Sequence, residues 1–257
     1  LDEVTALAAG EPLVTEREEV TWSGGQVGAV RVRRLGAIDL AVTPIPVDQE
    51  AGVAAVRAAL TDGRGEAGLG LLHWTEAATT LRRRMAFAHA RLGDPWPAVG
   101  DDALTARLDE WLGPELLRLA EGAPPRSLDL VSALRRLLPW PEAGTFDEVV
   151  PERLPVPTGS RIRLTYPEDP AERPVLAVKL QECFGLTETP RVAGVPVLFH
   201  LLSPAGWPLA VTDDLASFWV NAYPGVRAEN RGRYAKHPWP EDPLTAPPQR
   251  GTKRSGR

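Results

Sequence analysis

The fold is indicated first by residues 20–43, which read Val20-Thr-Trp-Ser-Gly-Gly-Gln-Val-Gly-Ala-Val-Arg-Val-Arg-Arg-Leu-Gly-Ala-Ile-Asp-Leu-Ala-Val-Thr43. Apolar residues alternate with polar ones on both sides of Ser23-Gly24-Gly25, a pattern typical of two strands joined by a tight turn. A third alternating arm ends before Pro44, whose ring removes a backbone donor. The sequence therefore predicts an antiparallel meander over residues 13–46.

The second arm of this meander has two faces of different character. Val30 and Val32 alternate with Arg31 and Arg33, which predicts one buried face and one cationic face. Arg31 and Arg33 are therefore candidate contacts for an oligonucleotide. The alternative is an outer face of the sheet that meets solvent alone.

Helices are predicted for residues 50–138, where apolar side chains recur at helical spacing. Thr75, Asp101 and Ser127 are the expected N-caps, and Gly113-Pro114 is expected to break one helix into two. The expected helices cover residues 53–60, 75–92, 101–112, 115–120 and 127–138.

Strands return in residues 155–211. Residues 161–166 alternate strictly, residues 195–202 are nearly all apolar as in a well-buried strand, and Pro204-Ala205-Gly206 predicts a hairpin. A helix capped by Asp213 or Asp214 should end at Pro224, and a basic helix should follow over 226–234.

These patterns together predict an α+β chain. We expect a β-rich segment with one short helix at 1–72, a helical segment at 73–150 and a mixed α/β region with antiparallel strands at 151–246. The basic tail, residues 247–257, has too few apolar residues to bury and should be disordered.

Charge is distributed unevenly along the 257 residues. Residues 1–150 carry 15 arginines and 23 acidic residues, whereas residues 151–257 carry 14 basic and 11 acidic ones. Residues 226–257 alone hold eight Lys and Arg against three Asp and Glu. This end would attract a polyanion; the alternative is a tail that serves solubility.

Several features bear on the compartment. No apolar run is long enough to span a membrane, and the single cysteine, Cys183, excludes an internal disulfide. We therefore expect a cytoplasmic protein. The chain begins Leu1-Asp-Glu-Val-Thr5, without Met or a signal-type apolar core, so we expect it to be a piece of a longer protein.

The closing run, Arg231-Gly-Arg-Tyr-Ala-Lys-His-Pro-Trp-Pro-Glu-Asp-Pro243, brings cations next to aromatic rings. Cations suit phosphates and rings suit bases. Cationic candidates for phosphate contact are Arg227, Arg231, Arg233 and Lys236, with His237 beside them; the stacking candidates are Tyr234 and Trp239. The alternative is a structural belt in which the rings are buried, so the exposure of Tyr234 and Trp239 distinguishes the two hypotheses.

Catalytic chemistry is not indicated anywhere in the chain. The sequence has no Gly-x-x-x-x-Gly-Lys-[Ser/Thr] loop, no Asp-Glu-x-His run and too few cysteines and histidines for a common zinc site. Asp213-Asp214 fits a helix cap better than a metal site, Cys183 fits a buried inert thiol, and His200 fits a hydrogen-bonded core residue. We expect no catalytic residue and no metal ligand.

Several runs carry a family resemblance, among them Leu134-x-x-Leu-Leu-Pro-Trp140, Val156-Pro-Thr-Gly-Ser-Arg-Ile-Arg-Leu164, Val211-Thr-Asp-Asp-Leu-Ala-Ser-Phe-Trp219 and the closing run itself. Over about residues 13 to 245 the chain resembles the C-terminal region of the HrpB family of bacterial ATP-dependent helicases, of the DEAH/RHA type of superfamily 2.

The resemblance implies an accessory, non-catalytic region of a helicase that lacks the RecA-like motor domains. ATP and Mg²⁺ would then bind the motor domains of the parent ATP hydrolase, so no cofactor is expected here. The implied partners are single-stranded nucleic acid, with RNA expected, and the parent's own helicase core. The meander would start an OB-like barrel, closed locally or by strands from 155–180. The alternative function is a structural module that packs on the core or a partner without touching nucleic acid.

Overall fold

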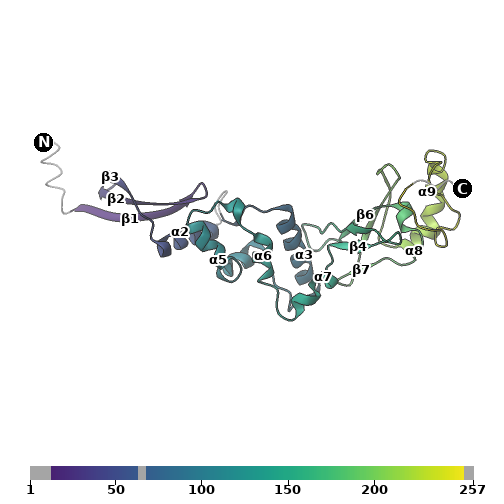
Figure 1. Cartoon of the computed structure of the whole chain (residues 1–257), viewed down its shortest axis with the longest axis horizontal. Helices are drawn as coiled ribbons and strands as arrows, with labels where there is room; N and C mark the ends of the chain where they lie inside the picture. Colours follow the sequence, from purple (N-terminus) through teal and green to yellow (C-terminus); the bar gives the residue numbers. More distant parts are fainter. Residues whose placement is uncertain (1–12, 63–67, 252–257) are drawn as a thin grey trace. The chain divides into compact units, whose positions relative to one another are not determined.

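The computed structural model describes residues 13–62 and 68–251 (Figure 1). The chain divides into two compact units. Unit 1 comprises Leu1–Ala78 and Gly100–Leu137, and unit 2 comprises Thr79–Val99 and Leu138–Arg257. Helix α3 (Glu76–Leu92) begins in unit 1 and continues in unit 2. The glycine-rich loop at 63–65 and the last six residues of the expected tail lie outside the described residues.

Unit 1 opens with the predicted meander, which is confirmed. Strands β1 (Val14–Ser23), β2 (Gln26–Leu35) and β3 (Ile38–Ile45) form one antiparallel sheet in the order β1-β2-β3. Gly24 and Gly25 connect β1 to β2 with φ of 60° and 79°, the left-handed region that favours glycine in a two-residue hairpin turn. The described strands of this sheet number three, so the OB-like barrel remains a prediction.

The helices of unit 1 bury one face each, as their spacing predicts. They are α2 (Gln49–Thr61), α4 (Asp101–Ala106), α5 (Leu108–Ala120) and α6 (Leu130–Arg135), with 3₁₀ turns η2 (Gly68–Leu71) and η3 (Pro125–Ser127). Helix α2 packs against α5 and β1. Trp111 of α5 is fully buried, stacks on Trp74 and donates its indole N–H to the Leu104 carbonyl at 3.0 Å.

Two helix boundaries in unit 1 differ from the prediction. Pro114 lies inside α5 instead of breaking it, because Trp111, Leu112 and Leu116 are all buried around it and this packing outweighs the roughly 3 kcal/mol that an interior proline costs. The cap of α6 is Asp129, whose carboxylate accepts from the Ser132 N–H at 3.0 Å.

Other expected caps can be compared in the same way. Thr75 accepts from the Ala78 N–H at 3.2 Å, as predicted for the start of α3. Asp101 is the first residue of α4, and the N-cap position is Gly100. Helix α3 ends at Leu92, before Gly93, as expected.

Unit 2 is built on short strands. They are β4 (Arg153–Pro155), β5 (Arg161–Arg163), β6 (Val175–Lys179), β7 (Arg191–Val192), β8 (Val195–Pro196), β9 (Leu198–Leu202) and β10 (Pro208–Thr212). Strands β10, β9 and β6 form a mixed sheet in that order; β9 pairs antiparallel to β10, the predicted hairpin, and parallel to β6. Two further antiparallel pairs join β4 to β5 and β7 to β8.

The apolar run 195–202 behaves differently from the prediction. Phe199 and Leu201 of β9 are fully buried, whereas Leu198, His200 and Leu202 are half-buried. Because β9 is the middle strand of a sheet with one covered face, its side chains alternate in burial although nearly all are apolar.

The helical part of unit 2 includes η4 (Glu142–Thr145), α7 (Phe146–Val149), η5 (Leu180–Cys183), α8 (Leu215–Ser217), the π-helical turn η6 (Phe218–Ala222) and α9 (Tyr223–Asn230). Pro224 does not end the helix as predicted: it lies in the first turn of α9, where the missing N–H costs little. The rings of Phe184, Phe218, Trp219 and Tyr223 pack around this turn.

The α+β class is confirmed, with a three-stranded antiparallel sheet, a helical middle and a mixed sheet in order along the chain. Among the described residues, no helix combines the length and apolar character needed to cross a membrane. The tail starts within the structure: Gln249 donates its backbone N–H to the Gln181 carbonyl at 2.9 Å, and Arg250 donates to the Thr158 carbonyl at 3.2 Å.

Candidate nucleic-acid interface

The closing run is fixed to unit 2 by hydrogen bonds around Trp239. This ring is 8% exposed, and its indole N–H donates to the Tyr234 carbonyl at 3.2 Å. Helix α9 supplies two more bonds: Arg227 Nε donates to the Trp239 carbonyl at 2.9 Å, and the Tyr223 hydroxyl donates to the Pro240 carbonyl at 2.8 Å. Residues 234–240 therefore have a defined path along α9.

Three predicted phosphate contacts lie on the outside of this path. Arg231, Arg233 and Lys236 are exposed, and Tyr234 and His237 are half-buried. The Arg233 guanidinium lies 5.8 Å from the centre of the Tyr234 ring, within cation–π range. The exposure of the two rings, which distinguishes the hypotheses, gives a divided answer: Trp239 is buried, as a structural belt requires, whereas Tyr234 is half-buried.

Arg227 has a structural role in this arrangement. Besides its bond to the Trp239 carbonyl, its guanidinium pairs with Glu241 at 3.0 Å, and its side chain is 23% exposed. It also lies near Tyr223, whose pKa is raised to about 12 mainly by burial, with Arg227 opposing that rise. Arg227 thus joins α9 to the closing run.

The expected cationic face of β2 has mixed charge. Arg31 pairs with Glu18 at 2.8 Å and with Glu16 at 3.2 Å, and the register places Glu16 directly opposite Arg33. The hydrogen bond that Arg31 donates to Glu18, together with the negative charges of Glu18 and Glu16, raises the pKa of Arg31. The prediction of a cationic face on β2 was therefore wrong, because β1 places a carboxylate opposite Arg31 and another opposite Arg33.

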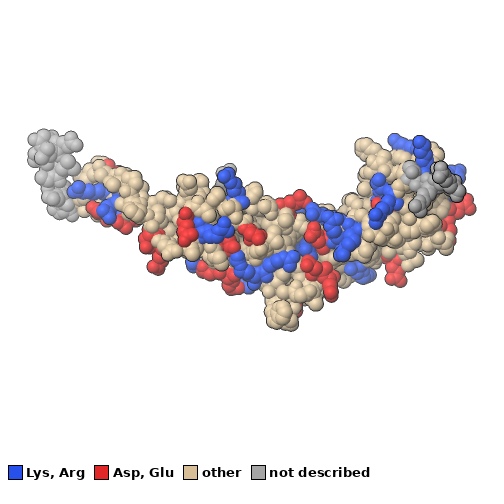
Figure 2. All heavy atoms as spheres, in the orientation of Figure 1, with Lys and Arg blue, Asp and Glu red and all other residues tan. Residues whose placement is uncertain are grey.

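A cationic face that was not among the predicted sites lies on the β4–β5 hairpin. Arg153 is directly opposite Arg163, and Arg161 is opposite Pro155, so the three arginines share one face. All three are exposed, whereas Leu154 and Ile162 on the other face are half-buried. Figure 2 shows Lys and Arg atoms gathered over the part of unit 2 that Figure 1 labels β4 and β6. The strict Arg-Ile-Arg alternation was the signal for this face.

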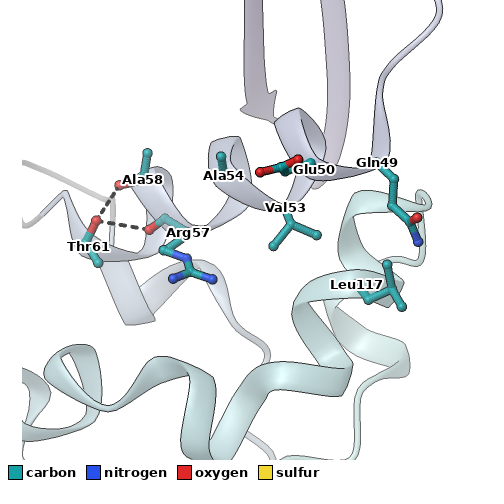
Figure 3. Close-up of a pocket in the computed structure, with 8 residues that line it drawn as sticks. All are labelled: Gln49, Glu50, Val53, Ala54, Arg57, Ala58, Thr61 and Leu117. Carbon is teal, nitrogen blue, oxygen red and sulfur yellow. Dashed lines mark hydrogen bonds between the residues drawn. The ribbon is translucent and has the colours of Figure 1, made fainter.

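A groove of about 710 Å³ lies in unit 1 between α2 and α5 (Figure 3). Four of its lining residues are apolar and four are polar: Val53, Ala54, Ala58 and Leu117, and Gln49, Glu50, Arg57 and Thr61. Arg57 at its edge makes a bidentate pair with Asp109, at 2.8 and 2.7 Å. None of the predicted site residues lines this groove.

The residues weighed as metal ligands or nucleophiles have structural roles. Asp214 caps α8 by accepting from the Ser217 N–H at 3.0 Å, and Asp213 pairs with Arg173 at 2.5 Å. Cys183 is buried, and burial, helped by the charge of Glu182, raises its pKa to about 12. Within the described residues no group of His, Cys, Asp and Glu is arranged to hold a metal ion.

Comparison with known proteins shows which family has this sequence and architecture. The family model for the ATP-dependent helicase C-terminal region, HrpB_C, matches residues 111–243. The chain is 39% identical over 249 residues to the ATP-dependent RNA helicase HrpB of Escherichia coli (strain K12), a match that covers 94% of this chain and 30% of that relative.

Solved structures agree with this match. The crystal structure of E. coli DExH-box NTPase HrpB aligns with a TM-score of 0.73 at 36% identity, covering 98% of this chain and 31% of that one. The crystal structure of Escherichia coli DEAH/RHA helicase HrpB aligns with a TM-score of 0.63 at 38% identity, covering 88% and 29%. This chain therefore spans less than a third of the length of the relatives that it matches. On these matches it belongs to the ATP-dependent helicase C-terminal family and is similar to the C-terminal region of HrpB.

Proposed function

We propose that this chain is an accessory region of an ATP-dependent RNA helicase and that it contacts single-stranded RNA through Arg231, Arg233 and Lys236. The family supports the accessory role, and the printed name of the E. coli relative supports RNA. ATP and Mg²⁺ would bind outside these 257 residues, in a cytoplasmic parent protein.

The carrying observation is that a fixed backbone presents exposed cations. Bonds from Arg227 and Tyr223 to the Trp239 and Pro240 carbonyls hold the closing run against α9. The backbone N–H groups of Arg231 and Tyr234 donate to the Arg227 and Asn230 carbonyls, each at 2.9 Å, so the three cations extend from an ordered segment. A preordered cationic surface loses little conformational entropy when a phosphate backbone binds. In this proposal Tyr234 is the ring available to a base, and Trp239 acts as the anchor of the segment.

The test is a salt series. A fluorescent single-stranded oligouridylate is titrated with the chain and with the variant Arg231→Gln, Arg233→Gln, Lys236→Gln. Each lost phosphate contact should make the dependence of log K on log salt less steep by about 0.7 for a single strand, about 2 for the three together. The matched control removes the same charge from exposed arginines of unit 1: Arg17→Gln, Arg118→Gln, Arg126→Gln.

The control should leave the slope unchanged. Equal loss in both variants would show a dependence on net charge alone, and no loss in either would rule out this surface. An unfolded variant is recognised by its circular dichroism spectrum before titration.

A second candidate function, docking on the helicase core or a partner protein, has its own support. Trp140, Trp207 and Val220 of unit 2 are 87%, 68% and 73% exposed, and large exposed rings are typical anchors of protein interfaces. Calorimetric titration of the chain into the separately purified motor part of a full-length homologue tests it. Trp140→Ala with Trp207→Ala should then weaken binding at least about tenfold; undiminished binding rejects these anchors.

A further inference from the structure

The β4–β5 hairpin carries an arrangement of charges that the fold itself does not require. Arg153 and Arg163 are directly opposite each other in the antiparallel pair. Side chains opposite each other on one face of a sheet lie close together, and like charges there destabilise the pair. On β1–β2 the same chain places Glu18 opposite Arg31, so arginine opposite arginine is not its general rule.

The local contacts orient these arginines without neutralising the face. Arg153 donates one N–H to the Arg161 carbonyl at 3.1 Å, which holds the guanidinium over the hairpin. Of the three arginines on this hairpin, Arg163 pairs with a carboxylate, that of Glu152 at 3.2 Å. Within the described part of the chain, Arg153 and Arg161 make no such ion pair.

The turn of the hairpin brings a fourth cation. Arg250 donates to the Thr158 carbonyl at 3.2 Å, and a Cβ at Gly159 would lie 3.9 Å from its guanidinium. The Thr158 and Ser160 hydroxyls donate to Glu182 at 3.0 and 2.9 Å, which places one carboxylate at this end of the hairpin. The surface therefore has an excess of positive charge, and its natural partner is a polyanion.

The chemistry of the groups selects the kind of polyanion. Guanidinium forks match phosphate oxygens in pairs, and same-face residues of one strand, such as Arg161 and Arg163, are about 6.6 Å apart. That spacing lets two guanidinium groups bind separate phosphates of an extended chain. We propose that Arg153, Arg161 and Arg163 form a second phosphate-binding surface for single-stranded RNA, an inference that rests on the proposed RNA contact of this chain.

The test compares two pairs of arginines with the same spacing on a strand. Arg161→Gln with Arg163→Gln removes two cations from β5, and Arg31→Gln with Arg33→Gln removes two from β2, where carboxylates face them. With a fluorescent oligouridylate across a salt series, the β5 variant should bind about 10-fold more weakly at low salt. Its salt slope should be less steep by about 1.4. The β2 variant should match the unchanged chain.

Further variants make each result decisive. Arg161→Lys with Arg163→Lys keeps the charges and should keep the slope, which a merely structural role would not predict. An unchanged slope in the β5 variant, while Arg231→Gln, Arg233→Gln, Lys236→Gln lowers it, overturns this inference alone. The reverse result overturns the closing run and keeps the hairpin.

Two outcomes reject the RNA assignment of the hairpin directly. Absence of any binding by the unchanged chain at low salt overturns both proposals. A polyglutamate peptide of equal charge that binds as tightly as the oligouridylate, and through the same two arginines, would assign the surface to an acidic protein instead.

Discussion

The indole N–H of Trp239 donates to the backbone carbonyl of Tyr234 at 3.2 Å, and this bond closes a loop over residues 234–239 at the surface of unit 2. The ring that closes the loop is buried, while Arg233 and Lys236 beside it are exposed. Residues of one short segment thus have two different roles: the buried aromatic residue fixes the backbone, and the cations remain exposed on the surface.

Trp239→Ala should destabilise the chain strongly, because it removes a large buried side chain and leaves a cavity. Buried Trp to Ala changes cost about 3–5 kcal/mol, and Trp239→Phe should cost less, since it keeps most of the packing and loses one hydrogen bond worth about 1 kcal/mol. Urea unfolding followed by circular dichroism measures both. Trp207→Ala, at a 68% exposed ring, is the control and should change the free energy of unfolding by less than about 0.5 kcal/mol. Equal effects at the two positions would contradict the burial of Trp239.

Two neighbouring arginines of α3 should differ sharply in their effect on stability. Arg84 is 3% exposed, donates to the Val150 carbonyl at 2.7 Å and pairs with Asp147 at 2.5 Å. Arg84→Ala leaves a buried carbonyl unpaired, which should cost about 2–3 kcal/mol. Arg83→Ala removes an exposed pair with Glu168 at 3.7 Å and should cost between about 0 and 1 kcal/mol.

The measurement is again denaturant unfolding, at two salt concentrations. The Arg83 pair is screened in high salt and the buried Arg84 bond is not, so the difference between the variants should persist at 0.5 M salt. An Arg84→Ala variant as stable as Arg83→Ala would show that the Val150 carbonyl finds another donor.

Local sequence patterns predicted most helices and strands of this fold. They did not predict which strands pair or which side chains pack together, because these depend on residues far apart in the sequence. The period of two in residues 20–43 and the Gly24-Gly25 turn specify β1 and β2 without help from elsewhere. The parallel pairing of β6 with β9 joins residues that are 23 positions apart, such as Val175 and Leu198, for which no local signal exists. Pro114 misled because its cost is local whereas the packing that overcomes it is not.

The candidate site divides in the same way. Arg31 looked like part of a cationic surface because one strand was considered by itself; the register with Glu16 and Glu18 changes its meaning. Trp239 could have stacked on a base or been buried, since a ring next to prolines suits both, and the contacts with α9 decide its burial. The alternating sequence predicted that Arg161 and Arg163 share one face of a strand, but it did not predict that Arg153 of β4 lies opposite Arg163.

Cys183 should resist thiol reagents in the folded chain. Burial raises its pKa from about 9 to about 12, so almost no thiolate exists at pH 8, and the side chain is inaccessible. Reaction with Ellman's reagent at pH 8 should therefore await unfolding by urea. A variant with an added exposed thiol, Ala205→Cys, should react with one equivalent immediately; prompt reaction of the unchanged chain would contradict the burial.

The raised pKa of Cys183 also links stability to pH. Because the folded state disfavours the thiolate, the contribution is complete below about pH 9 and is lost as pH rises toward 12. Cys183→Ala should lose stability less steeply than the unchanged chain between pH 9 and 11. Tyr223, raised to about 12 by burial, contributes in the same direction to both proteins.

The start of α6 offers a direct choice between a sequence-based cap and the observed one. Asp129 accepts from the Ser132 N–H at 3.0 Å and from its hydroxyl at 2.6 Å, whereas the Ser127 hydroxyl donates to the Pro124 carbonyl in the preceding turn. Asp129→Ala should cost about 1 kcal/mol of unfolding free energy, and Ser127→Ala much less. Hydrogen bonds from Ser132 lower the pKa of Asp129, so its stabilisation is present above about pH 4 and is lost as pH falls through the lowered value. The gap between the unchanged chain and Asp129→Ala should accordingly be constant from pH 5 to 8 and shrink in acid; a gap that is independent of pH down to 3 would mean that the carboxylate is not the cap.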